Sequence, residues 1–421
     1  MVIKKQWAVG LLSLTLAVTC LFAGCSARKE VPGSSEIPLL GEASDAVNQE
    51  TAKEAETEST EKEGIEKENT VAESAAESRE GSPEGSTEDS PEAEEPQEIR
   101  ITVTAAGDVT LGNYLGQGYD NSFDQTYEAV EDKGYFFENV KAIFEEDDFT
   151  IVNLEGVLST WEEAEPGRTF NIKGRPEYVN LIKEASVEGV SMGNNHRMDY
   201  GETGTKDTAA NLEGVGIPYA FDDRTGIFEV EGIRIGWVSV NEASYGASVE
   251  RHLKQGITAL REQGTELVIA CCHWGTEREY FPEEYQTELG RKCIDWGADL
   301  VLGHHPHVLQ GIDCYKGKYI VYSLGNFCFG ANKNPGDKDT MIFQQTFVFS
   351  EGELTDELSA RVIPCRISSV THRNDYKPTP LAGAERLQLI DRINGFSSAF
   401  GVIIAEDGTL EWHPEMAEGV E

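Results

Sequence analysis

Six short apolar runs in this chain of 421 residues end in side chains that can bind a metal ion or transfer a proton. The polar residues after the successive runs are Asp108, Asn153 with Glu155, Asn194, Asn195 and His196 with Asp199, His273, the three histidines of GHHPH (303–307), and Asn326. If the runs are strands of one α/β fold, their carboxyl ends meet at the edge where such folds bind ligands. The pattern therefore predicts one site built from several strand ends.

Each of these residues also has an ordinary structural explanation. Asp108 could cap a turn, the asparagines of GNNH (193–196) are typical turn residues, and His273 could be a core histidine bonded to a carbonyl. GHHPH could be a turn with an exposed histidine tip. Their recurrence at the same end of every run favours a shared site over separate explanations.

The ligand types agree with a divalent cation. Carboxylate, amide oxygen and imidazole together suit Mn, Fe or Zn, whereas a structural zinc site is dominated by cysteine and histidine. No C-x-x-C pair occurs among the cysteines after residue 98, which are Cys271, Cys272, Cys293, Cys314, Cys328 and Cys365. A set of this size can serve one or two ions, and two ions bridged by a carboxylate promote hydrolysis by phosphoryl transfer.

Alternating strand and helix patterns position these residues. Strands are expected at 100–107, 149–156, 189–194, 233–241, 266–275, 299–305 and 319–327, and helices near 127–145, 176–186, 203–213, 249–263 and 282–297. The alternation predicts an α/β fold, and CYKGKY (314–319) predicts a turn that makes its sheet mixed. We predict that residues 99–330 form the core, and that the strand-rich residues 331–421, with a helix near 384–395, complete the same domain.

The amino-terminal segment predicts export and anchoring. Residues 1–25 place two lysines before an apolar stretch that ends in small residues, which is typical of a signal peptide. LFAGC (21–25) resembles a bacterial lipobox, so Cys25 is the expected lipidation site; the alternative is an uncut signal-anchor helix. Residues 26–98, rich in Glu, Ser, Thr, Ala and Pro, predict a disordered acidic tether. The remaining chain is then expected on the outer face of the bacterial cell membrane.

The charge balance excludes one class of partner. The chain has 75 acidic and 35 basic residues, which gives a net charge of -40. Proteins that bind nucleic acid in general need a basic surface to neutralise phosphates. We therefore expect no nucleic-acid partner.

Several motifs resemble those of a known family. They are GDVTLG (107–112), VNLEG (152–156), GNNHRMDYG (193–201), HWGTE (273–277), GADLVLGHHPHVLQG (297–311) and YSLGNF (322–327). In this order they resemble the bacterial capsule-synthesis CapA family, also called PgsA, whose members are membrane-attached poly-γ-glutamate biosynthesis proteins. The resemblance implies a calcineurin-like metallophosphatase fold, which is a four-layer sandwich of two mixed sheets flanked by helices.

The resemblance also implies residue roles. The implied metal ligands are Asp108, Glu155, Asn195, His273, His305 and His307. Glu155 stands where the superfamily has a bridging aspartate, and His196, with Asp199, is the catalytic candidate that steadies or protonates a leaving group. The superfamily reads D-x-H where this chain has Thr110, so one ion, two ions or an adapted site all remain open.

Other residues are expected around the metal or the substrate. His304 either binds the metal or hydrogen-bonds one of its ligands, and the remaining candidates are Asn153, Asn194, Glu277 and Asn326. Lys173 and Arg175 in FNIKGRP (170–176) are either ordinary surface cations or binders of an anionic substrate.

Two hypotheses for function follow. In the first, a surface-tethered, metal-dependent hydrolase cleaves a phosphate ester or an amide while an anionic exopolymer similar to poly-γ-glutamate is made, exported or anchored. In the second, the chain is a non-catalytic scaffold or polymer-binding component of the capsule machinery. A generic extracellular metallophosphoesterase is a third alternative. The expected partners are the membrane, capsule synthase subunits and an anionic polymer.

Overall fold

The computed structural model describes residues 98–242 and 246–417. The predictions for the signal peptide, for Cys25 and for nearly all of the acidic tether lie outside these residues. Among the helices in this part of the chain, none combines the length and the apolarity that crossing a membrane requires.

The larger sheet of the described residues contains nine strands. Its main path, in spatial order, is β18 (Thr379–Pro380), β17 (Ser359–Arg366), β15 (Asp339–Ser350), β1 (Glu98–Thr110), β3 (Phe149–Leu154), β6 (Gly189–Ser191) and β7 (Tyr219–Ala220). β14 (Asn326–Phe329) also pairs with β1, and β16 (Glu353–Leu354) pairs with β15. β1 is parallel to β3 and β14 but antiparallel to β15, so this sheet is mixed.

The second sheet contains six strands. They run in the order β12 (Ile312–Tyr315), β13 (Lys318–Val321), β11 (Leu300–His304), β10 (Leu267–His273), β9 (Ile233–Asn241) and β8 (Gly226–Val230). The four central strands are parallel, and the two edge strands are antiparallel to their neighbours. The turn predicted at CYKGKY joins β12 to β13.

Alternation along the strands explains why the two sheets stack. In β10, Leu267, Ile269 and Cys271 belong to the apolar core between the sheets. Their neighbours in the sequence, such as Val268 and Ala270, belong to the core on the outer face. Successive side chains of a strand point to opposite faces, so a strand that is apolar throughout must be covered on both sides.

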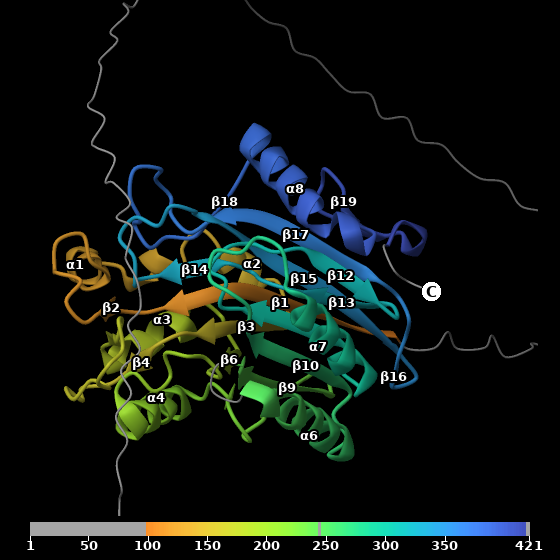
Figure 1. The fold of residues 1–421 in the computed structure, drawn as a ribbon, viewed down its shortest axis with the longest axis horizontal. Helices are drawn as coiled ribbons and strands as arrows, with labels where there is room; N and C mark the ends of the chain where they lie inside the picture. The colour runs from red at the N-terminus through yellow and green to blue at the C-terminus, as the bar shows by residue number, and fades with distance from the viewer. Residues whose placement is uncertain (1–97, 243–245, 418–421) are drawn as a thin grey trace, which may run out of the picture. The chain divides into compact units, whose positions relative to one another are not determined.

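Helices supply the two outer layers. α6 (Val249–Glu262) and α7 (Glu284–Asp295) cover the six-stranded sheet, and α1 (Phe123–Ala129), α2 (Lys141–Glu145), α3 (Val179–Glu184) and α4 (Gly201–Val215) cover the nine-stranded sheet. Figure 1 shows α6 and α7 beside β9 and β10, and α8 (Gly383–Ser397) beside β17.

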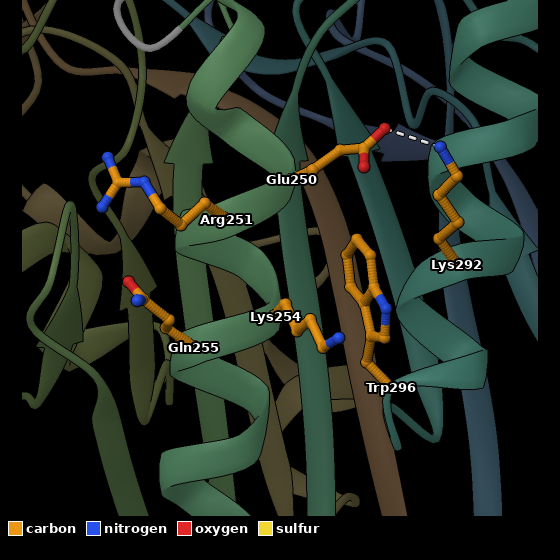
Figure 2. A pocket seen from close by; sticks show the side chains of 6 residues that line it. All are labelled: Glu250, Arg251, Lys254, Gln255, Lys292 and Trp296. Carbon is orange, nitrogen blue, oxygen red and sulfur yellow. Dashed lines mark hydrogen bonds and ion pairs between the residues drawn. The ribbon is translucent and has the colours of Figure 1, made fainter.

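In α6 the buried residues Val249, Leu253, Ile257 and Leu260 form one apolar stripe. On the outer side of the same helix, Glu250 pairs with Lys292 of α7 at 2.6 Å, as Figure 2 shows. The predicted architecture, two mixed sheets flanked by helices, is confirmed.

Two small sheets complete the fold. β2 (Asn113–Tyr114), β5 (Ile172–Gly174) and β4 (Val157–Leu158) form one of them. Because β2 follows β1 and β4 follows β3 in the sequence, this sheet begins where the two central strands end. β19 (Val402–Ile404) and β20 (Leu410–Trp412) form the other.

The strand predicted at 319–327 is wrong as a single element. The chain leaves the six-stranded sheet after β13 and joins the nine-stranded sheet as β14. Gly325 lies between them with a φ of 72°, which side-chain-bearing residues rarely adopt, and this turn breaks the strand. The crossing brings Asn326 into register with Asp108.

The helix predicted at 127–145 is also divided. α1 ends at Ala129, a short 3-10 helix spans Lys133–Phe136, and α2 begins only at Lys141. The carboxylate of Asp132 accepts a hydrogen bond from the backbone N–H of Gly134 at 2.9 Å. This local bond starts a new turn and competes with a continuous helix.

Candidate metal centre

The predicted strand ends converge where the two sheets meet. In the nine-stranded sheet, Asp108 is in register with Asn153 on β3 and with Asn326 on β14, and in the six-stranded sheet His273 is in register with His304. A side chain at Gly107 would place its Cβ 2.0 Å from the carbonyl oxygen of Gly325. A residue without a side chain is therefore needed where β1 approaches this turn.

Asp108 is fully buried and lies among donors. Its Oδ1 accepts a hydrogen bond from Asn153 Nδ2 at 2.8 Å and lies 3.1 Å from His304 Nδ1, while its Oδ2 lies 3.1 Å from His307 Nδ1. Burial works against the charge of this carboxylate, but the contacts with His304 and His307 outweigh it. The pKa of Asp108 is therefore held well below its usual range.

Glu155 is the most unusual residue of the cluster. It has no exposed surface, and neither carboxylate oxygen has a hydrogen-bond partner. Its Oε1 lies 3.7 Å from Nε2 of His273, 3.7 Å from Nε2 of His307 and 3.9 Å from Nε2 of His196. Burial raises the pKa of Glu155 to about 7, even though His307 acts in the opposite direction. A buried carboxylate surrounded by imidazoles but bonded to none calls for a ligand.

The histidines differ in charge because their surroundings differ. Burial, helped by the charge of His307, lowers the pKa of His305 to about 4. Burial and the neighbouring ring of His305 likewise hold the pKa of His273 well below its usual range. At His307 burial is outweighed by Glu155 and Asp108, so its pKa rises to about 9. His305 and His273 are thus neutral at neutral pH and keep a lone pair for a metal.

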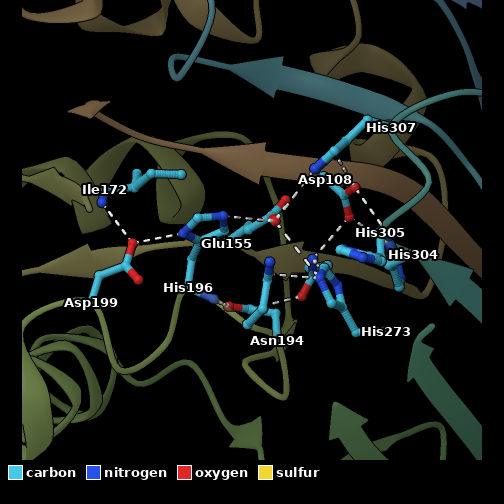
Figure 3. Close-up of polar contacts among 12 residues, drawn as sticks. Asp108, Glu155, Ile172, Asn194, His196, Asp199, His273, His304, His305 and His307 are labelled. Atoms are coloured by element: carbon cyan, nitrogen blue, oxygen red, sulfur yellow. Dashed lines mark hydrogen bonds and ion pairs between the residues drawn. The ribbon is translucent and has the colours of Figure 1, made fainter. Parts of the chain in front are cut away.

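The backbone of GHHPH is held in a special conformation. His305 has a φ of 96° and His307 a φ of 58°, in the left-handed region that residues other than glycine rarely adopt. Such conformations persist where the surrounding structure enforces them, and they concentrate at functional sites. Here they aim two histidines from one short loop at the same cluster, as Figure 3 shows.

The donor atoms fit a divalent cation. Three overlapping sets place their ligand atoms within 4.8 Å of one another, and these are Asp108–Glu155–His307, Glu155–His273–His305 and Glu277–His305–His307. The two unpartnered oxygens of Glu155 and the unpartnered, buried Nδ1 of His305 are free to bind an ion. Asn195 completes this group, since its Oδ1 lies 2.9 Å from His273 Nε2. Of the predicted metal ligands, all six are brought together here.

His196 and Asp199 form a second functional unit beside the cluster. Nδ1 of His196 lies 2.7 Å from Oδ2 of Asp199, a carboxylate with no exposed surface, and Nε2 of the same ring faces Glu155. Asp199 Oδ2 also accepts the backbone N–H of Ile172 at 2.6 Å. Burial opposes a charged ring, but the bond to Asp199 and the charge of Glu155 prevail, so the pKa of His196 is raised. The pair can hold a proton at Nε2 and release it toward the cluster.

Sequence reasoning missed Arg168. Its guanidinium donates to Asp199 Oδ1 at 2.9 Å and to the backbone carbonyl of Asn195, so it connects the proton-holding pair to a ligand-bearing loop. The signal was a third cation in the segment that leads into FNIKGRP. The prediction considered only Lys173 and Arg175 from that segment.

The other predicted residues divide into two groups. Asn194 donates to Asn153 Oδ1 at 3.1 Å, and Asn326 donates to the carbonyl of His307 at 3.1 Å, so these amides brace the cluster. Lys173 and Arg175 instead make ion pairs elsewhere, Lys173 with Glu162 at 3.4 Å and Arg175 with Glu128.

Thr110 stands at the position where the D-x-H pattern would supply an imidazole. It is fully buried, and its hydroxyl oxygen has no hydrogen-bond partner. The hydroxyl therefore offers one oxygen where that pattern has a ring nitrogen.

Together, the two stacked mixed sheets and the carboxylate–imidazole cluster at their strand ends define an α/β protein with a candidate metal centre. The family model described as "Bacterial capsule synthesis protein PGA_cap" matches residues 102–331, and the chain belongs to this family. The resemblance inferred from the motifs is thereby confirmed.

Named relatives agree with this assignment. The chain is 29% identical over 259 residues to "Capsule biosynthesis protein CapA" of Bacillus anthracis, covering 55% of this chain and 60% of the relative. It is 28% identical over 253 residues to "PGA biosynthesis protein CapA" of Bacillus subtilis (strain 168), covering 54% of this chain and 63% of the relative. The matched segments thus span less than two thirds of either relative.

Solved structures give more distant matches. A hypothetical protein from Thermus thermophilus aligns with a TM-score of 0.40 and 18% identity, over 63% of this chain and 99% of that one. A 5'-nucleotidase precursor from the same organism aligns with a TM-score of 0.38 and 11% identity, over 71% of this chain and 58% of that one.

Proposed function

We propose that this chain acts in bacterial capsule biosynthesis as a surface-tethered protein with a metal-dependent hydrolase site, working on an anionic polymer similar to poly-γ-glutamate or on its precursors. Membership of the capsule-synthesis family supports the process. The single observation that carries the site is Glu155, buried with both oxygens unpartnered among three imidazoles.

In this proposal Asp108, Glu155, Asn195, His273, His305 and His307 hold one or two ions of Mn, Fe or Zn. The ion would supply Lewis-acid polarisation of a phosphoryl or carbonyl oxygen. The side chains of the protein orient the proton donor and hold its proton. Asp199 fixes the ring of His196 so that Nε2 points into the cluster, and Nε2 holds the proton that a leaving group requires.

The experiment measures metal and turnover on the purified full-length chain. Metal content is determined after loading with Mn, Fe or Zn, and hydrolysis is assayed on phosphomonoesters, phosphodiesters and γ-glutamyl oligomers. We expect Glu155→Ala to lose metal, and His196→Ala to keep metal and lose turnover. His413→Ala, at a half-buried histidine near the carboxyl terminus that lies beside Glu411 and Glu415, serves as the matched control. A wild-type chain that binds none of these metals would refute the site.

A non-catalytic scaffold is the second candidate, and Thr110 favours it. A hydroxyl stands where the superfamily has an imidazole, and the loss of one ligand can leave a site that binds but does not turn over. Stoichiometric metal without hydrolysis, together with loss of capsule in the Glu155→Ala strain, would support this candidate over the hydrolase.

We further propose that the chain is anchored to the outer face of the membrane through a lipid on Cys25. The lipobox-like LFAGC supports this part of the proposal. Metabolic labelling with a radioactive fatty acid tests it. Label on the wild type but not on Cys25→Ser, with the variant lost from the membrane fraction, is the expected result. Equal labelling of both would refute it.

A further inference from the structure

Glu277 is an exposed carboxylate beside the candidate metal centre. It follows β10 by four residues, its side chain is exposed, and its carboxylate lies within 4.8 Å of ligand nitrogens of both His305 and His307. We propose that Glu277 is a metal ligand, which closes the solvent side of the centre together with these two histidines. This inference rests on the proposed metal centre and extends it by one residue.

The three ligand sets are linked in a specific way. The two buried sets share Glu155, which therefore joins them from inside the protein. The third set shares His307 with one buried set and His305 with the other. Glu277 therefore joins the same two sets from outside. Each of the two histidines therefore lies near a buried carboxylate, Glu155, and near an exposed one, Glu277.

Backbone hydrogen bonds fix Glu277 in this place. The N–H of Trp274 donates to the carbonyl of His304 at 3.1 Å, and the N–H of Arg278 donates to the carbonyl of Pro306 at 2.8 Å. These two bonds, whose donors stand before and after Glu277 in the sequence, tie the loop that carries Glu277 to the loop that carries His305 and His307. Arg278 adopts a φ of 67°, so the conformation is enforced by the pairing of the loops.

The chemistry of Glu277 complements the departure at Thr110. The chain has a hydroxyl at that position, and it also has an exposed carboxylate, Glu277, near His305 and His307. A carboxylate is a harder ligand than an imidazole and shifts preference from Zn²⁺ toward Mn²⁺. Because Glu277 is exposed, it can also give way to an anionic substrate group without disturbing the buried ligands.

The experiment titrates the metal-depleted full-length chain with Mn²⁺ and with Zn²⁺, using calorimetry and the rise in melting temperature. We expect Glu277→Gln to weaken Mn²⁺ binding by about tenfold or more, because even the loss of a group that only orients a ligand commonly costs that much. We expect Glu277→His to restore binding with its preference moved toward Zn²⁺. Glu279→Gln, two residues along the same exposed loop, is the matched control and should bind like the wild type.

Three results separate the inference from the metal centre itself. Equal Mn²⁺ affinity in the wild type and Glu277→Gln would overturn the role of Glu277 and leave the buried centre standing. A wild-type chain that binds neither ion would overturn both. Equal weakening in Glu277→Gln and Glu279→Gln would mean that only the general negative charge of the loop matters, which also overturns the inference. The melting temperature of each metal-depleted variant shows that it is folded.

Discussion

The carboxylate of Asp199 lies 2.7 Å from Nδ1 of His196, and this contact decides which ring nitrogen faces Glu155. Asp199 is itself held by the N–H of Ile172 and by Arg168, so the ring is positioned by a chain of contacts that begins at the surface. The side chains of the metal cluster and the proton-holding pair face each other across the 3.9 Å between Nε2 of His196 and Oε1 of Glu155. Arg168 also joins Asp199 to the backbone carbonyl of Asn195.

Asp199→Asn should disturb the pair of His196 and Asp199 without changing metal binding. The substitution keeps the shape of the side chain but removes the charge that His196 and Arg168 face. We expect the free energy of unfolding to fall by about 1–3 kcal/mol, because a hydrogen-bonded charge is replaced by a neutral amide in a buried position. Metal content should stay the same. Urea denaturation and metal analysis measure the two effects, with Asp222→Asn, which breaks the ion pair with Arg197, as the control.

Arg168→Ala should lower turnover while metal content stays at the wild-type value. The guanidinium steadies Asp199 and, through it, the orientation of His196, so its loss should reduce kcat by about tenfold or more. Guanidinium ion added to the assay should restore part of the rate in this variant only. Arg175→Ala is the matched control, since Arg175 pairs with Glu128. An equal loss of rate in the control would instead favour substrate binding by the cations of FNIKGRP.

Glu155→Gln should stabilise the metal-depleted chain. The carboxylate is buried without a hydrogen-bond partner, which is costly, and a neutral amide of the same size reduces that cost. We expect a gain of about 1–3 kcal/mol in the free energy of unfolding without metal. The rise in melting temperature that metal gives the wild type should disappear. A variant less stable than the wild type without metal would show that Glu155 is a structural residue.

Much of this site could be predicted because its residues follow strands with strong patterns. β10 and β11 are apolar up to the histidine that ends each of them, so their ends could be predicted from the sequence. Parallel pairing then places the strand ends at one edge of a sheet. This pairing occurs in both sheets, between β1 and β3 and between β10 and β11. The fold class followed from the same alternation of strands and helices.

The features that could not be predicted from the sequence depend on contacts between segments that are distant in the chain. The break at Gly325 arises because the chain changes sheets there, and no local pattern signals that change. Arg168 was missed because it reaches the site from a loop, through the hydrogen bond that its guanidinium donates to Asp199. Glu277 was named as a candidate, but its place beside His305 and His307 depends on bonds such as Arg278 N–H to Pro306 C=O. Periodicity describes how an element faces its layer, but it does not describe how two loops pair.

Glu188 should make the stability of the chain depend on pH away from the metal centre. Its Oε2 accepts the backbone N–H of Thr150 at 2.8 Å, and burial raises its pKa from the ordinary value of 4.5 to about 7. Between these values the folded chain keeps a proton that the unfolded chain has released. The contribution of Glu188 to the free energy of unfolding is therefore fully present below about pH 4.5 and is lost as the pH rises through about 7.

Glu188→Gln removes this titration and keeps an oxygen to accept from Thr150. The variant should match the wild type near about pH 4.5 and exceed it by about 1–2 kcal/mol near about pH 8, a figure reduced because Glu188 is only partly buried. Urea unfolding across this range measures the difference. Asp147, whose pKa burial raises to about 6, titrates in both chains, and its charge contributes to the raised pKa of Glu188. Glu184→Gln, an exposed residue of α3, should leave the pH profile unchanged, and a parallel shift of the Glu188→Gln curve at all pH values would contradict the titration of Glu188 as its cause.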